Sequence, residues 1–211
     1  GYLPRFGFFG NDALYVQWQS RDQRTLKLLR SASLSALSQN TETIPLKLLV
    51  KETDRAWVQL HNDLRFFPDG RFLWPSERKG VREIYLHAAD GSPVRVVATG
   101  PDPVVKVVAF DAKEGRVFYV RATQRSRSRQ LYSARTDEGP SSQRLLTPIA
   151  GWHAIRAAPK GKAFVDAFSL PVFDGHGSLG EEGVSAWFLP SRVTVRGELG
   201  ETRLVLSPNP A

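Results

Sequence analysis

Three tight turns recur along this chain at nearly equal spacing, and this repeat limits the possible fold more than any other feature. The turns are Asp69-Gly70, Glu114-Gly115 and Lys160-Gly161, so their glycines are 45 and 46 residues apart. Each turn separates an apolar run from a run rich in β-branched and aromatic residues, which is the pattern of a β-hairpin. A four-stranded propeller blade takes about 40–50 residues, so the spacing predicts an all-β fold made of β-propeller blades.

A second element keeps the same step, because Arg82-Glu83-Ile84-Tyr85 is followed 47 residues later by Arg129-Gln130-Leu131-Tyr132. We therefore predict about four four-stranded antiparallel sheets. The expected blades cover approximately residues 2–56, 57–103, 104–151 and 152–211. An isolated arc of blades would expose edge strands, which natural proteins avoid. We therefore expect a piece of a longer chain, because an isolated arc would leave edge strands exposed. The initial Gly1 and the absence of methionine favour the same interpretation.

Regions without strand patterns are predicted to be loops. Residues 31–43 are polar and contain four serines, and residues 173–182 contain three glycines, so both segments are expected to be surface loops. No window shows a helical period over three turns, which predicts very little helix.

Arginine and lysine residues give the chain a formal charge of +8, so nucleic-acid binding has to be considered. The one dense cluster contains Arg121, Arg125, Arg127 and Arg129, with no aromatic residues between them to stack on bases. We interpret it as a solvated loop between two strands and do not expect a nucleic-acid partner.

Motifs for metal, cofactor or covalent chemistry are weak or missing. The chain has no cysteine, which excludes disulfides, thiolate zinc sites and a cysteine nucleophile. Residues 175–180 match G-x-G-x-x-G by letters but lack the strand and helix of a dinucleotide site. A G-x-S-x-G nucleophile motif is absent. The four histidines lack the spacing of metal ligands; they are His61, His87, His153 and His176. We expect no catalytic residue, metal or cofactor in this chain.

Membrane insertion and export signals are not expected either. No apolar run approaches the roughly 18 residues of a transmembrane helix. The first residues lack the charged and apolar regions of a signal peptide.

Several motifs in order resemble bacterial members of the dipeptidyl peptidase IV family. The strongest run contains Asp69-Gly70-Arg71-Phe72-Leu73-Trp74 followed by Ser76-Glu77-Arg78, with residues 58–66 before it and Ile84-Tyr85-Leu86 after it. Residues 18–23 and 151–169 fit as well, so the resemblance runs from Tyr2 to about Ser169.

The resemblance implies the second half of an eight-bladed propeller that precedes an α/β-hydrolase domain. That domain, which carries the family's Ser-Asp-His triad, is not present in this sequence. The parent protein would be a serine exopeptidase that removes N-terminal dipeptides, usually after proline or alanine. Its propeller would limit access to unfolded peptides and position them. The implied partners are the peptide substrate, the remaining blades and the hydrolase domain. Homodimerisation, and a periplasmic or cytoplasmic location in a bacterium, stay open.

The resemblance also suggests a substrate-binding loop at residues 59–63. In the family, the loop after Trp57-Val58 faces the central cavity and lines the pocket for the substrate's penultimate residue. His61 or Asn62 would then donate to substrate carbonyls, which need donors in a desolvated pocket. The alternative, that these residues only close a blade turn, remains open.

Two departures from the family are visible. Glu181-Glu182 lies between glycines and late in the chain, so the family's amine-binding glutamate pair is not assigned to it. Residues 172–187 look like an insertion.

Two other functions compete with this interpretation, a non-enzymatic propeller that binds peptides or proteins and a basic nucleic-acid binder. A downstream G-x-S-x-G region would favour the peptidase. The chain alone is expected to have no hydrolase activity.

Overall fold

The computed structural model describes residues 1–10, 12–36, 43–123, 128–169 and 192–206, and these residues form an almost purely β structure. They contain sixteen strands and two short 3₁₀ turns, η1 (Leu34–Ala36) and η2 (Pro159–Gly161), and within the described ranges there is no α-helix. The predicted all-β fold class is confirmed. The chain divides into two compact units, Gly1–Thr99 and Gly100–Ala211, and each is described by itself.

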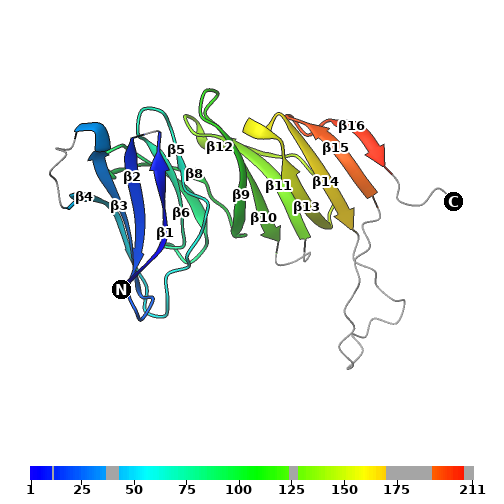
Figure 1. The fold of residues 1–211 in the computed structure, drawn as a ribbon. Coiled ribbons are helices and arrows are strands. Elements are labelled where there is room, and N and C mark those ends of the chain that lie inside the picture. The colour runs from blue at the N-terminus through cyan, green and yellow to red at the C-terminus, as the bar shows by residue number, and fades with distance from the viewer. Residues whose placement is uncertain (11, 37–42, 124–127, 170–191, 207–211) are drawn as a thin grey trace. The chain divides into compact units, whose positions relative to one another are not determined.

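The first sheet of the first unit is an antiparallel meander whose strands lie side by side (Figure 1). Its strands are β1 (Tyr2–Phe9), β2 (Ala13–Gln19), β3 (Thr25–Ser33) and β4 (Leu46–Thr53). β3 continues to Ser33, so it includes the first three residues of the loop expected at residues 31–43. The reason is local pairing, because the Ser31 hydroxyl accepts the Leu14 N–H at 2.9 Å and Ser33 pairs with Ala13.

The second sheet of this unit is also a four-stranded antiparallel meander. Its strands are β5 (Arg65–Phe66), β6 (Phe72–Ser76), β7 (Glu83–His87) and β8 (Pro93–Ala98). The predicted turn at Asp69-Gly70 joins β5 to β6, with Gly70 at φ +89° and its N–H donating to the Phe67 carbonyl. Leu28 of the first sheet and Trp74 of the second are fully buried in one shared core.

The second unit contains two meanders, (β9–β12) and (β13–β16). The first has β9 (Val104–Asp111), β10 (Arg116–Thr123), β11 (Ser128–Arg135) and β12 (Gly139–Leu145). The second has β13 (Trp152–Ala157), β14 (Ala163–Ser169), β15 (Arg192–Gly197) and β16 (Thr202–Leu206). One parallel pair, Arg129 with Trp152, joins β11 to β13, so all eight strands form one sheet.

The predicted turns of the second unit adopt the left-handed backbone that their sequences favour. Gly115 has φ +59°, and Lys160 and Gly161 have φ +58° and +72°. At Gly161 a side chain would collide with Phe118, whose ring lies 2.4 Å from the position of a Cβ. Phe118 and Phe164 are buried in the core of this unit, so the turn packs directly on that core.

The arginine cluster differs from its predicted description as a solvated loop. Arg121 lies in β10, is only 7% exposed and has its guanidinium 5.2 Å from the ring centre of Tyr132. Arg129 lies in β11 with its guanidinium 4.0 Å from the Trp152 ring centre. Because aromatic faces attract the weakly hydrated guanidinium, Arg121 is buried within the sheet structure, and the partly exposed Arg129 packs against an indole ring. Arg125 and Arg127 lie outside the described residues, as do His176, the Glu181-Glu182 pair and the segments 172–187, 173–182 and 175–180.

Candidate functional site

The loop that joins β4 to β5 is held at Val58 from two sides. The Val58 N–H donates to the Gln23 carbonyl at 2.8 Å, and Gln19 Nε2 donates to the Val58 carbonyl at 2.9 Å. Gln23 has φ +59°, a conformation that costs a residue with a side chain about 1–2 kcal/mol. The Gln23 carbonyl that accepts the Val58 N–H therefore belongs to a turn with a strained backbone.

His61 lies inside the loop and is only 7% exposed. Its Nδ1 accepts the Asp63 N–H at 3.3 Å, and its ring meets Trp74 edge-on at 4.6 Å. Burial, together with the positive charge of Arg82, lowers the pKa of His61 to about 3. The ring is therefore neutral with its proton on Nε2, which is buried beside the Pro75 backbone without a well-formed hydrogen bond.

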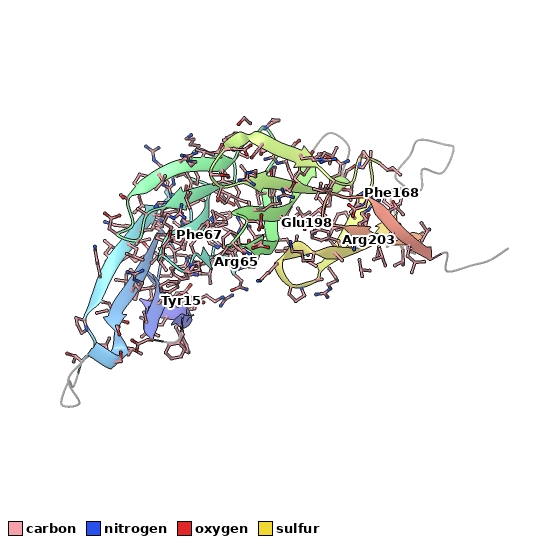
Figure 2. The ribbon with its side chains drawn as sticks, turned by 90° about the horizontal axis from the view of Figure 1, so that it is seen from above. Tyr15, Arg65, Phe67, Phe168, Glu198 and Arg203 are labelled. Atoms are coloured by element: carbon pink, nitrogen blue, oxygen red, sulfur yellow. The ribbon has the colours of Figure 1, made fainter. Side chains whose placement is uncertain are left out.

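Asn62, the next residue, is exposed and held by two arginines. Arg5 Nε of β1 donates to Asn62 Oδ1 at 2.5 Å, and Arg65 Nη1 of β5 donates to the Asn62 carbonyl at 2.9 Å. Figure 2 labels Arg65 in the first unit. Because Oδ1 accepts from a guanidinium, the amide orientation is fixed and Nδ2 remains a donor toward solvent.

An ion pair closes the loop. Asp63 Oδ2 lies 2.7 Å from Arg82 Nη2, and both side chains are 11% exposed. Val58, Asn62 and Asp63 are thus each tied to a different neighbouring segment. Such a loop presents its exposed groups in a fixed geometry, as a binding site requires.

A cavity of about 240 Å³ lies beside this loop. Its walls include His61 and Trp57, which is 60% exposed, together with Glu52, Glu77 and Arg78. Arg78 Nη2 contacts Glu52 Oε1 at 3.0 Å, and its guanidinium lies 4.3 Å from the Tyr85 ring centre. The pairing therefore links β4 to the β6–β7 turn.

A buried charge cluster in the second unit was missed by the sequence analysis. His153 Nδ1 contacts Asp166 Oδ1 at 2.8 Å, and Arg196 Nε donates to Asp166 Oδ2 at 2.9 Å. His153 Nε2 lies 2.8 Å from the Ile149 carbonyl, so both ring nitrogens face oxygen acceptors. Three strands contribute these residues, and their separations of 13 and 30 positions match no local motif. Within the cluster, Asp166 of β14 pairs with His153 of β13 and with Arg196 of β15, so the three residues link neighbouring strands.

Three of the four histidines lie among the residues that the structure describes, and they come from different elements. His61, His87 and His153 lie in a loop, at the end of β7 and in β13. Within the described ranges, no group of three or more potential ligands among histidine and acidic residues is arranged to hold a metal ion. Among the same residues, no helix has the length and apolarity to cross a membrane.

The family model for the dipeptidyl peptidase IV (DPP IV) N-terminal region matches residues 1–173. The chain belongs to this family. The match covers the loop at residues 57–63 and all of β1–β14, so the resemblance seen in the sequence motifs is confirmed.

Two solved structures have the fold of this DPP IV N-terminal region. Porphyromonas gingivalis dipeptidyl peptidase 4 is 22% identical with a TM-score of 0.76, over 98% of this chain and 26% of that one. A protein described as a dipeptidyl aminopeptidase IV from Bacteroides ovatus is 16% identical with a TM-score of 0.69, over 98% of this chain and 30% of that one. The present chain thus spans less than a third of either structure.

Proposed function

We propose that this chain is the substrate-gating and positioning part of a dipeptidyl peptidase IV-like serine exopeptidase that removes N-terminal dipeptides. The observation that carries the proposal is the fixed loop at residues 57–63, with Asn62 as its exposed donor. One of the two Nδ2 hydrogens of Asn62 would be donated to a substrate carbonyl. His61 would act as a positioning residue, because its ring is buried against Trp74 and supports the Asp63 N–H.

The proposal treats the four meanders as blades, at approximately residues 2–56, 57–103, 104–151 and 152–211, of a larger propeller. The first sheet supports further blades because both of its faces are apolar. One face buries Leu26 and Leu28 in the core shared with the second sheet. On the other, Phe6 and Phe8 of β1 are 71% and 66% exposed.

Gating would follow from geometry. A ring of blades around the active site excludes folded chains before any bond is broken, while an extended N-terminus can pass. The serine, aspartate and histidine of the reaction would come from an α/β-hydrolase domain outside this chain, so its own contribution is access and orientation.

The test is cleavage of a Gly-Pro p-nitroanilide. We expect no turnover from residues 1–211 alone, and turnover from a longer protein that joins this chain to a hydrolase domain. Detectable cleavage by the chain alone would contradict the assignment of catalysis to another domain. A longer protein that binds peptides but never cleaves this substrate would instead support a non-enzymatic binding propeller.

A further inference from the structure

A basic donor group lies at the exposed end of the candidate site, next to Asn62. Arg5 is exposed on β1, and its Nε donates to Asn62 Oδ1 at 2.5 Å. Its Nη1 donates to the Pro4 carbonyl at 2.7 Å. Both of these acceptors are uncharged, so neither neutralises the guanidinium. Among the residues that the structure describes, Arg5 Nη2 has no acceptor.

The charges around this donor group are predominantly positive. Asp63 is the carboxylate of the loop, and it is held by Arg82 at 2.7 Å. Arg65 brings a further guanidinium to the Asn62 backbone. His61, buried behind the loop, has its pKa lowered by burial first and then by the charges of Arg82 and Arg65. An anion at this surface would therefore meet a favourable field.

Two donors thus belong to one hydrogen-bonded pair of side chains, Arg5 Nη2 and the second N–H of Asn62 Nδ2, and the Arg5–Asn62 hydrogen bond fixes one side chain relative to the other. A carboxylate has two oxygens that accept such a pair of hydrogen bonds, and charge assistance strengthens them. A protonated amine would meet only donors and a like charge. The ligand chemistry that fits is therefore a carboxylate.

We propose that Arg5 and Asn62 bind the side-chain carboxylate of an acidic residue in the substrate's N-terminal dipeptide. This inference rests on the proposed function, because it takes the loop to face the peptide. It makes Arg5 a specificity-determining residue that contacts substrate. Glutamate or aspartate in the dipeptide would be preferred over glutamine or asparagine of the same shape.

The test uses the longer peptidase that contains this chain and four p-nitroanilides, Glu-Pro, Gln-Pro, Gly-Glu and Gly-Gln. None has a free C-terminal carboxylate, so only the side chain can supply the anion. We expect kcat/KM to favour glutamate over glutamine by about tenfold at one of the two positions. The preference should shrink in about 1 M salt, where the Debye length is about 3 Å.

Two variants test whether Arg5 and Asn62 cause the preference for glutamate. Arg5→Gln should bring the glutamate-to-glutamine ratio close to one. Asn62→Asp should lower it further, because the new carboxylate pairs with Arg5 and repels the ligand. Lys47→Gln is the matched control: it removes one positive charge from β4, the opposite edge of the same sheet, and should leave the ratio unchanged.

The outcomes separate this inference from the proposed function. Cleavage of Gly-Pro p-nitroanilide with no glutamate preference, or with a preference that survives Arg5→Gln, overturns the carboxylate site and leaves the peptidase assignment standing. No cleavage of any of these substrates overturns both. If acidic substrates are favoured but Lys47→Gln removes the preference as well, general surface charge explains it and the Arg5–Asn62 site is wrong.

Discussion

At the scale of single residues, His61 shows how burial determines chemistry. The ring packs on Trp74, and its pKa falls to about 3. It therefore stays neutral at pH values below 6.5, at which an exposed histidine becomes protonated. Between the folded value of about 3 and the unfolded value of about 6.5, the unfolded chain binds more protons. The free energy of unfolding therefore falls as the pH falls below about 6.5. Burial lowers the pKa of His87 as well, which adds to the effect in the same direction.

This effect predicts how His61→Phe behaves. The aromatic ring is kept but the titrating group is lost, so the decrease in unfolding free energy from pH 7 to pH 5 should be smaller by about 2 kcal/mol. Urea unfolding of the first unit at the two pH values measures the difference. A variant that is destabilised equally at both would show that His61 contributes only packing.

At the scale of elements, glycine is required in a turn where a neighbouring strand leaves no room for a side chain. Gly91, in the turn between β7 and β8, has φ +97°, and a Cβ there would lie 2.1 Å from the Leu49 carbonyl oxygen of β4. Gly80, between β6 and β7, has φ +87° but nothing within 4 Å. The two glycines have a similar backbone conformation, but only Gly91 lacks room for a side chain.

Alanine at these two glycines should therefore have different costs. Gly80→Ala is expected to cost about 1–2 kcal/mol from its backbone conformation alone. Gly91→Ala should cost about 3 kcal/mol or more, because β4 must also move. Thermal and denaturant unfolding of the two variants compare these costs directly. Equal losses would mean that the β7–β8 turn does not press against β4.

The elements also show which features a single sequence can predict. The turns at Gly70, Gly115 and Gly161 were predictable because glycine there provides a positive φ between two apolar runs. The burial of Arg121 was not, because the ring that accepts its guanidinium belongs to Tyr132 on the next strand. Serine-rich composition likewise suggested a loop at Ser31, where cross-strand pairing continues β3.

The candidate site was predictable only in part. The family resemblance suggested a loop at residues 59–63 and singled out His61 and Asn62. It did not show which of the two is exposed, since that depends on Trp74 packing against one ring. Nor did it show Arg5, because the strand that carries it lies far from Asn62 in sequence and meets it only through the fold.

At the scale of the whole molecule, the exposed apolar face of the first sheet is the main feature. A row of paired residues crosses all four strands from Phe6 through Val16 and Leu29 to Leu48. Phe6 and Leu48 at its ends are 71% and 46% exposed. Val16 within the row is only 4% exposed, so the exposed apolar side chains lie at its two ends. Exposed apolar patches often mark an interface.

We therefore expect residues 1–211 to self-associate when they are studied alone. Sedimentation velocity over a range of concentrations should show association that the double substitution Phe6→Ser, Phe8→Ser removes. Leu199→Ser is the control, because Leu199 is 52% exposed as a single residue in the β15–β16 turn. If the double variant associates as strongly as the original chain, the face formed by β1 is not the contact.

The single parallel link between β11 and β13 limits how the repeats can be separated. The Arg129 N–H donates to the Gly151 carbonyl at 2.9 Å, just before Arg129 pairs with Trp152. A cut between the third and fourth repeats would therefore break this backbone pairing and remove the Trp152 indole from the Arg129 guanidinium. Exchanging either repeat for a homologous one would require both sides of this junction to be transplanted together.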